Sequence, residues 1–298
     1  MKRRPPAPGR QRGVALIVSL LVVAIVTALA LLFTARQQLW MRQIENRNNF
    51  TMAIGVAVAA IDMGRLTLRD DARRTTSDNL LEPWTIPIPP IAVEEGKVAG
   101  RITELQGRYN LTNLLPAQGV SLREDDAGVA RVARALELSP GELVRVLREF
   151  QSLRQREPEG TPELAELLRI AALPAESQGR FQQMLAVLPE KAPLNVNFAS
   201  AEALQATVAG LTAGDAAALV AQRTGNPFKT LNEFTQALPA GVRGGIATDA
   251  LTVQSRYFLM DIDAWFNEMH TAYQALLLRD GTRLPTLLWA RRSKLGPS

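Results

Sequence analysis

Cysteine is absent from this chain of 298 residues, and histidine occurs once, as His270. Without cysteine there are no disulfide bonds, thiolate metal sites or cysteine nucleophiles. The sequence also lacks a P-loop and a Gly-x-Ser-x-Gly motif, and a lone histidine is more often a surface or strand-edge residue than a general base. We therefore predict that the protein is not an enzyme, with an anchored enzyme as the alternative.

Net charge is confined to the first thirteen residues. Five basic residues lie there, which are Lys2, Arg3, Arg4, Arg10 and Arg12, and they account for the formal charge of +5. The 34 Lys and Arg residues less these five leave 29, which equals the 29 Asp and Glu residues. A neutral body has no general attraction for nucleic acid. With 47% hydrophobic residues, this body has enough apolar material to form cores.

A long apolar run follows the basic residues, from Val14 to Phe33, and only Ser19 and Thr27 interrupt it. A helix of this length is about 30 Å long and crosses one bilayer. The preceding positive charges predict a cytoplasmic N-terminus. We expect a transmembrane helix over 14–34, with the bulk of the chain on the other side of the membrane. A cleavable secretory signal is the alternative.

The same helix is predicted to continue outside the lipid. No proline occurs between Phe33 and about Leu68, and apolar residues recur throughout this stretch. Since proline breaks a helix interior, its absence favours one continuous helix. We therefore expect residues 35–68 to prolong the membrane helix into the exported part of the protein.

The N-terminus resembles the leader of type IV prepilins, a short basic segment that ends in Arg12-Gly13 before the apolar run. In that family a membrane peptidase cuts after the glycine and methylates the new N-terminus. The resemblance implies a leader over 1–13, cleavage after Gly13, N-methylation of Val14 and prepilin peptidase as a partner. Removing the charges is a physical precondition for lifting the helix out of the membrane.

Valine at position 18 departs from the common pattern. Most members of the family carry glutamate at the fifth mature position, where it neutralises the amine of the neighbouring subunit; here that position is Val18. A subunit with no neighbour ahead of it has no such amine to meet. Among the pseudopilins of type II secretion systems, this absence resembles the K-type minor pseudopilin, and it implies a position at the tip.

The exported part begins and ends with predicted strands. Prolines at 83, 87, 89 and 90 predict an extended connection over Asn79–Pro90. The expected strands are Lys97–Leu105, Leu251–Leu259, Ala272–Leu278 and Pro285–Ala290, and Asp280-Gly281 is a hairpin signal between the last two. One predicted strand thus precedes a region that contains helix-start signals, and about three predicted strands follow it.

That intervening region contains helix-start signals. Ser139-Pro140-Gly141-Glu142, Thr161-Pro162-Glu163 and Thr230-Leu231-Asn232-Glu233 each open a predicted helix, and another is expected from Phe181 to Leu188. We predict an α+β fold in which a long N-terminal transmembrane helix carries a pilin-like antiparallel sheet, interrupted by an all-helical inserted domain. The expected boundaries are 69–120 and 245–298 for the pilin-like domain and 121–244 for the insertion.

Two asparagine-rich segments also resemble K-type pseudopilins, namely Tyr109–Leu115 and Pro193–Leu204, the latter followed by Ala216–Arg223 and Pro227–Leu231. The resemblance marks six motif residues: Asn110, Asn113, Asn195, Asn197, Arg223 and Phe228. The alternative is that the asparagines satisfy backbone groups in turns. The second segment also resembles the helix-hairpin-helix of DNA-uptake proteins, but 195–238 has a net charge of minus one, which disfavours phosphate contacts.

Calcium has been associated with the K-type family through an acidic loop. The corresponding stretch here is Phe150–Pro158, in which arginines replace the carboxylates. Calcium sites need six to eight oxygen ligands, so we expect no metal or other cofactor. Asp261 and Asp263 are expected to be exposed surface acids.

These observations predict a minor pseudopilin of a type II secretion system. The resemblance implies a single-pass protein of the inner membrane with a periplasmic body. It would cap the tip of the pseudopilus and help initiate its assembly for protein export across the outer membrane. The implied partners are the other minor pseudopilins and the major pseudopilin, with no nucleic acid and no small-molecule substrate. A type IV pilus minor pilin and an anchored DNA-uptake protein are the alternatives.

Overall fold

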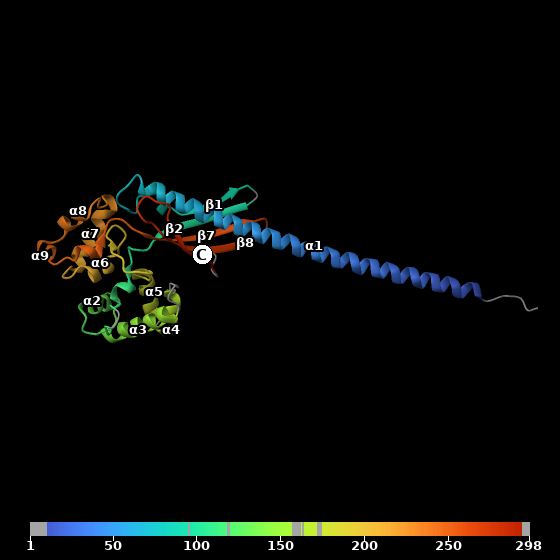
Figure 1. The fold of residues 1–298 in the computed structure, drawn as a ribbon, viewed down its shortest axis with the longest axis horizontal. Coiled ribbons are helices and arrows are strands. Elements are labelled where there is room, and N and C mark those ends of the chain that lie inside the picture. Colours follow the sequence, from blue (N-terminus) through green and yellow to red (C-terminus); the bar gives the residue numbers. More distant parts are fainter. Residues whose placement is uncertain are drawn as a thin grey trace, which may run out of the picture.

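The computed structural model describes residues 11–94, 96–117, 120–156, 162, 164–171 and 175–293. Helix α1 (Gln11–Ala72) runs without interruption and projects far beyond the head of the molecule (Figure 1). It is long and apolar enough to cross a membrane. The predicted long helix is confirmed, although it ends at Ala72 and not near 68. Residues 1–10, which hold four of the five leader charges, lie outside the described residues.

The head contains a five-stranded antiparallel sheet in the order β1-β2-β7-β8-β9. The strands are β1 (Ile88–Val93), β2 (Gly96–Glu104), β7 (Tyr257–Phe266), β8 (Met269–Leu278) and β9 (Thr286–Arg292). The second half of α1 packs against one face of this sheet, where Ala57 and Ile61 meet Met260 and Ile262. Neighbouring β2 and β7 are far apart in sequence, because the helical region lies between them.

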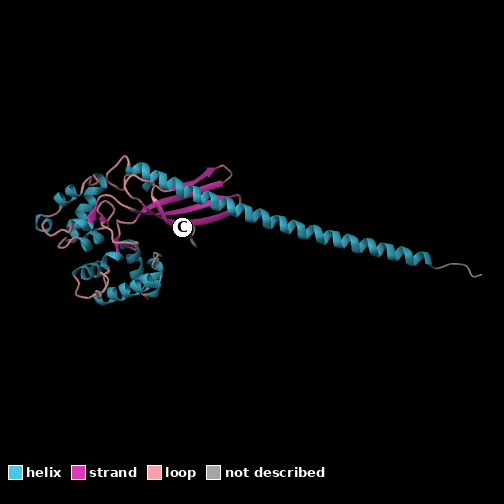
Figure 2. Cartoon of the chain, in the orientation of Figure 1, coloured by secondary structure: helices cyan, strands magenta, loops and turns pink. Residues whose placement is uncertain are grey.

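That helical region extends from α2 to α9: α2 (Ala127–Ala135), α3 (Pro140–Arg156), α4 (Leu164–Ile170), α5 (Ala175–Met184), α6 (Ala201–Thr207), α7 (Ala213–Gly225), α8 (Leu231–Ala237) and α9 (Ala240–Arg243). It lies at the end of the head away from the projecting part of α1 (Figure 2). The capping box at Ser139 is confirmed, since the side chain of Glu142 accepts the backbone N–H of Ser139. The residues Thr161 and Glu163 of another predicted helix start lie outside the described residues.

The inserted region is not purely helical. Two-residue strands pair in parallel, β3 (Tyr109–Asn110) with β4 (Leu185–Ala186) and β5 (Leu194–Asn195) with β6 (Leu251–Thr252). Short 3-10 turns complete the elements, η1 (Pro83–Thr85), η2 (Leu111–Leu114) and η3 (Thr248–Ala250). The helix predicted from Phe181 to Leu188 therefore ends at Met184, because the next two residues pair with β3. The predicted α+β class, with long helix and antiparallel sheet, is confirmed.

The strand predicted as Leu251–Leu259 is wrong in its middle. It is split into β6 and β7, and the intervening residues bend around Asp78 of the loop after α1. The backbone N–H of Asp78 donates to Val253 O at 2.8 Å, and the carboxylate of Asp78 accepts the N–H of Ser255. The predicted hairpin turn is confirmed, since Gly281 adopts φ +58° between β8 and β9. Sequence reasoning missed β1.

Candidate functional site: the apolar helix and the head junction

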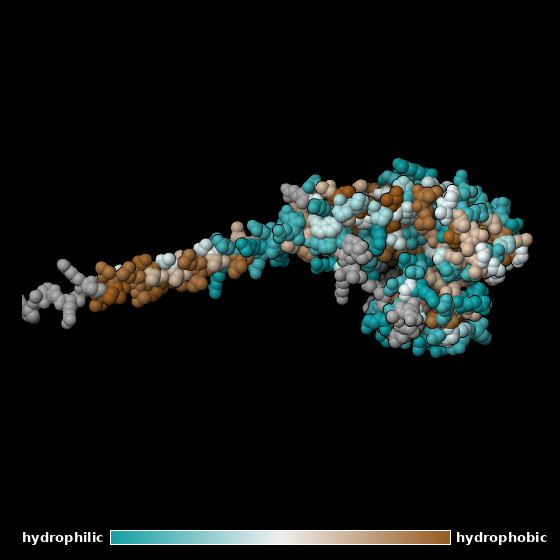
Figure 3. Space-filling model, turned by 180° about the vertical axis from the view of Figure 1, so that it is seen from behind, coloured by the Kyte–Doolittle hydropathy of each residue, from teal (hydrophilic) through white to brown (hydrophobic). Residues whose placement is uncertain are grey.

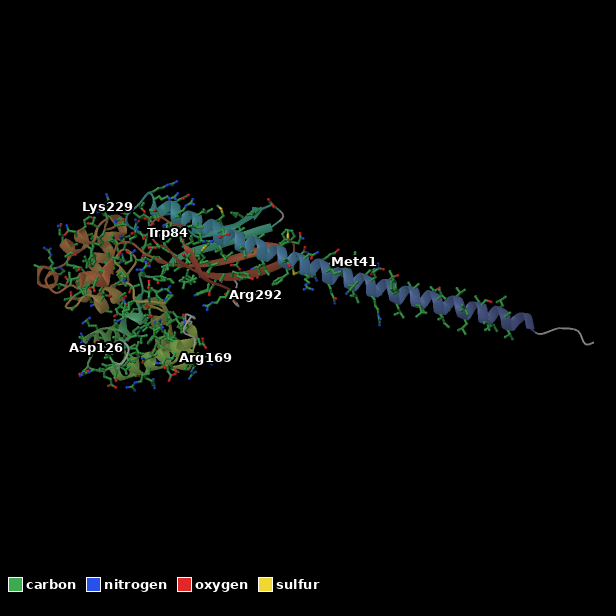
Figure 4. The ribbon with its side chains drawn as sticks, viewed as in Figure 1. Met41, Trp84, Asp126, Arg169, Lys229 and Arg292 are labelled. Atoms are coloured by element: carbon green, nitrogen blue, oxygen red, sulfur yellow. The ribbon has the colours of Figure 1, made fainter. Side chains whose placement is uncertain are left out.

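The N-terminal part of α1 presents apolar side chains on all sides. Val14, Val18 and Phe33 are between 51% and 70% exposed, and the space-filling view shows this stretch as a continuous apolar surface (Figure 3). Met41 lies on the part of α1 that projects from the head, as Figure 4 shows. Apolar surface of this extent is stable only in lipid or against other apolar helices. Gly13 and Val14 belong to α1 and lie far from the other motif residues.

Asn197 joins two distant segments at the junction between the sheet and the inserted helices. Its side-chain amide donates to Phe228 O at 2.9 Å and to Asp78 O at 3.1 Å, and its side-chain oxygen accepts the N–H of Phe228 at 2.9 Å. Asn195 is fully buried and donates to Ser255 Oγ at 2.7 Å. The structure thus brings Asn195, Asn197 and Phe228 together.

Asn110 and Asn113 hold the segment that leads from α5 to β5 through side-chain hydrogen bonds to its backbone; we call each such pair of asparagines, 110 with 113 and 195 with 197, a clamp. Asn113 binds the backbone of Ala192 twice, donating to its carbonyl at 2.8 Å and accepting its N–H at 3.0 Å. Asn110 accepts the N–H of Leu188 at 3.2 Å and donates to Glu190 O at 2.8 Å. Both asparagines satisfy backbone groups, as the turn interpretation expected.

Arg223 lies in the last turn of α7 and is 7% exposed. It donates to the carbonyl oxygen of Val196, between the two clamping asparagines. Burial lowers the pKa of Arg223 to about 10, so the side chain stays protonated at neutral pH. Phe228 is buried and packs edge-on against Phe234 with ring centroids 5.2 Å apart.

Sequence reasoning missed a buried ionic cluster around Arg279, at the end of β8. Arg279 is 2% exposed and donates to Asp71 at 3.2 Å, to Asp78 and to the carbonyl of Ser255. Carboxylate oxygens of Asp71, Asp78 and Glu82 all lie within 4.8 Å of one another. The cluster joins the end of α1, the following loop, the start of β7 and the end of β8. Nothing local in the sequence signalled it, because Arg279 lies far from Asp71 and Asp78 in the sequence.

A further buried carboxylate, Glu104, lies close to this cluster. It accepts the backbone N–H groups of Gln106 at 2.7 Å and Gly107 at 2.6 Å, as well as the hydroxyl of Ser255. Burial raises the pKa of Glu104 to about 7. A Cβ at Gly107 would approach the backbone carbon of Phe198 to 2.8 Å, so this turn accepts only glycine without rearrangement.

In the cluster of Asp71, Asp78 and Glu82 near Arg279, Glu82 keeps its proton at neutral pH. Burial, reinforced by the charges of Asp71 and Asp78, raises the pKa of Glu82 from its ordinary 4.5 to about 8. Burial also raises the pKa of Asp71. The indole N–H of Trp84 donates to Glu82, an interaction that lowers the pKa but is outweighed by burial. Trp84 itself lies buried beside this junction (Figure 4).

We expect the thermal stability of the protein to fall as the pH rises from about 5 to 8. In this range the native protein keeps the proton on Glu82 that the unfolded chain has already released, so unfolding releases a proton and is favoured by higher pH. Glu82→Gln, which imitates the protonated side chain, should reduce this dependence, and Glu104, whose pKa is also raised, should account for part of what remains. The measurement is the Tm of both proteins across this range. A gap between them that does not widen with pH would contradict the expectation.

The stretch that aligns with the calcium loop carries positive charge in contact with protein groups. Arg154 lies over the ring of Phe150 and donates to Pro189 O at 2.7 Å. Glu157 and Pro158 lie outside the described residues. His270 contacts Asp263 at 2.7 Å and stacks on Trp265. The expectation that Asp263 is exposed is wrong, because this residue is 4% exposed.

Known proteins resemble this chain in sequence and fold. Residues 194–254 match the family model described as type II secretion system protein K. A type II secretion system protein K of Pseudomonas aeruginosa is 30% identical over 281 residues, covering 83% of each chain. A protein of the same description from Aeromonas hydrophila is 29% identical over 110 residues, covering 37% of this chain and 33% of that protein.

A solved structure has the same fold. A chain in the crystal structure of the GspK-GspI-GspJ complex from the enterotoxigenic Escherichia coli type 2 secretion system is similar with a TM-score of 0.67 at 16% identity. The match covers 85% of this chain and 100% of that chain. The Pseudomonas relative, matched over most of both lengths, decides the family. This chain belongs to the type II secretion system protein K family.

Proposed function

We propose that this protein is the tip subunit of a pseudopilus, anchored in the inner membrane with its N-terminus in the cytoplasm and its head in the periplasm. The observation that carries the proposal is the single helix α1, which exposes an uncharged apolar surface over 14–33 and then becomes one layer of the head. Val18 adds no carboxylate to this surface. A helix of this kind suits transfer from lipid into a bundle of similar helices.

The position of the inserted helices supports a place at the tip. They lie at the end of the head opposite the projecting part of α1 (Figure 2). A subunit of the same shape stacked above would have to overlap them. We propose that the insertion ends the filament and that the counterparts of GspI and GspJ, which share a complex with GspK in the related structure, contact this chain below its tip. Neither catalysis nor a bound cofactor is part of this role.

The asparagine clamps support a structural role for the K-type motif. Asn195, Asn197, Asn110 and Asn113 make buried or half-buried bonds to backbone groups of the same chain. In this proposal they fix the inserted region to the loop after α1 and to the segments around it. The division into leader 1–13, membrane helix 14–34, extension 35–68, pilin-like parts 69–120 and 245–298, and insertion 121–244 belongs to the same proposal.

Intact-mass analysis of protein extracted from membranes with an active prepilin peptidase tests this function. We expect a chain that begins at Val14 and carries one added methyl group. Gly13→Leu should leave the leader attached, whereas Gly9→Leu, a matched change within the leader, should still be processed. A wild-type chain that begins at Met1, or at Leu31 after signal-peptide cleavage, would contradict the proposal.

A further inference from the structure

A cleft of about 330 Å³ opens in the inserted region, where α2 meets α6. Figure 1 shows α2–α5 and α6–α9 as two groups of helices on either side of this meeting point. Arg131 of α2 joins the two groups, since its Nε donates to Ala206 O of α6 at 3.1 Å. Pockets for small ligands have volumes of about 300–1,000 Å³. The cleft therefore has room for a small molecule or a single side chain, and not for a folded domain.

Three side chains that donate hydrogen bonds line the cleft, and we call them the donor set: Tyr109, Arg131 and Lys191. Among the described residues, the hydroxyl of Tyr109 and the ammonium of Lys191 have no hydrogen-bond or ion-pair partner. Arg131 makes its described hydrogen bond through Nε, which leaves its two terminal NH₂ groups available. A guanidinium and an ammonium can only donate. The donor set therefore requires a ligand that supplies acceptor oxygens.

The backbone that carries Lys191 is fixed on both sides by the clamp of Asn110 and Asn113. Asn110 donates to Glu190 O at 2.8 Å, and Asn113 binds both backbone groups of Ala192. The clamp thus holds the residues directly before and after Lys191. A site that is already in place loses less conformational entropy on binding. This gives the motif asparagines a second effect, which is to position a cation at the cleft.

Tyr109 is available to the cleft as a hydroxyl donor. Its backbone is held in β3, where it pairs with Leu185 of β4. Burial raises the pKa of Tyr109 to about 12; the charge of Asp126 also raises it, and the charge of Arg131 lowers it. The hydroxyl therefore keeps its proton at neutral pH. The action of Arg131 on this pKa also shows that the guanidinium and the hydroxyl are close enough to bind one ligand together.

Charge decides which kind of anion the cleft suits. Arg131 and Lys191 line it together with a single acid, Asp249, so two positive charges less one negative charge leave +1. The carboxylate of Asp126 is engaged as the N-cap of α2. One positive charge balances a carboxylate, whereas a phosphate group carries about −1.5 to −2 at neutral pH. The forked end of an arginine also matches the two oxygens of a carboxylate.

A larger hollow, of about 490 Å³, is lined by residues of β2, β7 and β8, but its charged groups satisfy one another. Arg101 donates to Asp261 at 2.9 Å, and Gln274 donates to the other oxygen of Asp261 at 2.8 Å. Asp263 contacts His270 at 2.7 Å. Free donors thus distinguish the cleft in the inserted region from this hollow.

We propose that the cleft binds a small carboxylate-bearing ligand whose anionic group is held by the donor set. The terminal NH₂ groups of Arg131 donate to the two carboxylate oxygens, and the ammonium of Lys191 and the hydroxyl of Tyr109 donate to the remaining lone pairs. Small side chains beside the donor set leave room for the carbon atoms of the ligand: Ala192, Ala206 and Ala250. A free organic acid and an acidic side chain of an extended peptide both present this group. The site goes beyond the proposed place at the tip, and neither depends on the other.

Ligand binding to the full chain in nanodiscs tests the proposal. Saturation-transfer difference NMR gives the dissociation constants of succinate, as a free acid, and of acetyl-Ala-Glu-Ala-amide, as an acidic side chain in a peptide. Inorganic phosphate is added as a competitor. The variants are Arg131→Gln and Tyr109→Phe, and the matched control is Arg134→Gln, an exposed arginine of the same helix that does not line the cleft. Thermal melts check that all variants are folded.

We expect saturable binding, with a dissociation constant roughly tenfold higher in Arg131→Gln, because a hydrogen bond to a charged group contributes about 1.5–3 kcal/mol. Tyr109→Phe should raise it about threefold, and Arg134→Gln should bind as the wild type does. Tighter binding of the peptide assigns the ligand to a protein segment, and tighter binding of succinate assigns it to a free acid. Equal dissociation constants in Arg131→Gln and Arg134→Gln, or no saturable binding of either ligand, would overturn the site. Phosphate that binds more tightly than both would overturn the assignment to a carboxylate.

Discussion

Arg279→Met is expected to lower the free energy of unfolding by about 3–5 kcal/mol, the usual cost of removing one partner from a buried ion pair. The substitution leaves Asp78, which is 1% exposed, without its cation. It also removes the bonds to Asp71 and to the carbonyl of Ser255, and the stacking of the guanidinium on Phe258 at 4.7 Å. Methionine fills part of the space but neutralises none of the carboxylates.

The measurement is a thermal melt of the full chain in detergent, followed by tryptophan fluorescence, because Trp84 is buried beside the cluster. A loss of this size corresponds to a Tm lower by roughly 10 °C. The matched control is Arg283→Met, a change in an exposed side chain of the following turn. Equal melting temperatures for the two variants would show that the cluster does not stabilise the head.

Asn197→Ala is expected to cost about 3 kcal/mol, because a buried polar group left without its partner costs 1–3 kcal/mol and three groups are affected. The substitution frees both backbone groups of Phe228 and the carbonyl of Asp78. These groups belong to the loop between α7 and α8 and to the loop after α1, so the loss falls on the junction between the inserted region and the end of α1. The sheet under α1 makes no use of this side chain.

Limited proteolysis and thermal melts distinguish this local effect from general unfolding. We expect cleavage within the inserted region to become faster in Asn197→Ala, and the Tm to fall. Asn226→Ala removes an exposed asparagine at the end of α7 and serves as the control. Protease resistance equal to that of the control would contradict a clamping role for Asn197.

Local signals were sufficient to predict α1, several inserted helices such as α3 and α8, and most strands of the five-stranded sheet. The apolar run from Val14, the capping box at Ser139 and the turn at Gly281 act through neighbouring residues, and sequence spacing contains that information. β1 was missed because its prolines resemble a connection. Pro89 and Pro90 fall where the pairing of β1 with β2 is irregular, between Ile88 and Ile91, and proline is tolerated at such bulges on an edge strand.

The head junction could not be predicted, because its bonds join segments far apart in sequence. Asp78 reaches Ser255 and Arg279, and this contact bends the chain that period-two spacing assigns to a single strand. The motif asparagines were found only through resemblance to a family. Their partners, such as the backbone of Phe228, were invisible in the sequence since any residue type can supply a backbone group.

The uninterrupted course of α1 has a mechanical consequence. A helix of 62 residues is a rod of roughly 90 Å, and its last turns are bonded into the head through Asp71. Within the described residues 11–72 the helix has no break between its apolar end, which is long enough to cross a membrane, and the folded body. A force applied along the axis at the N-terminal end of α1 is therefore transmitted directly to the head.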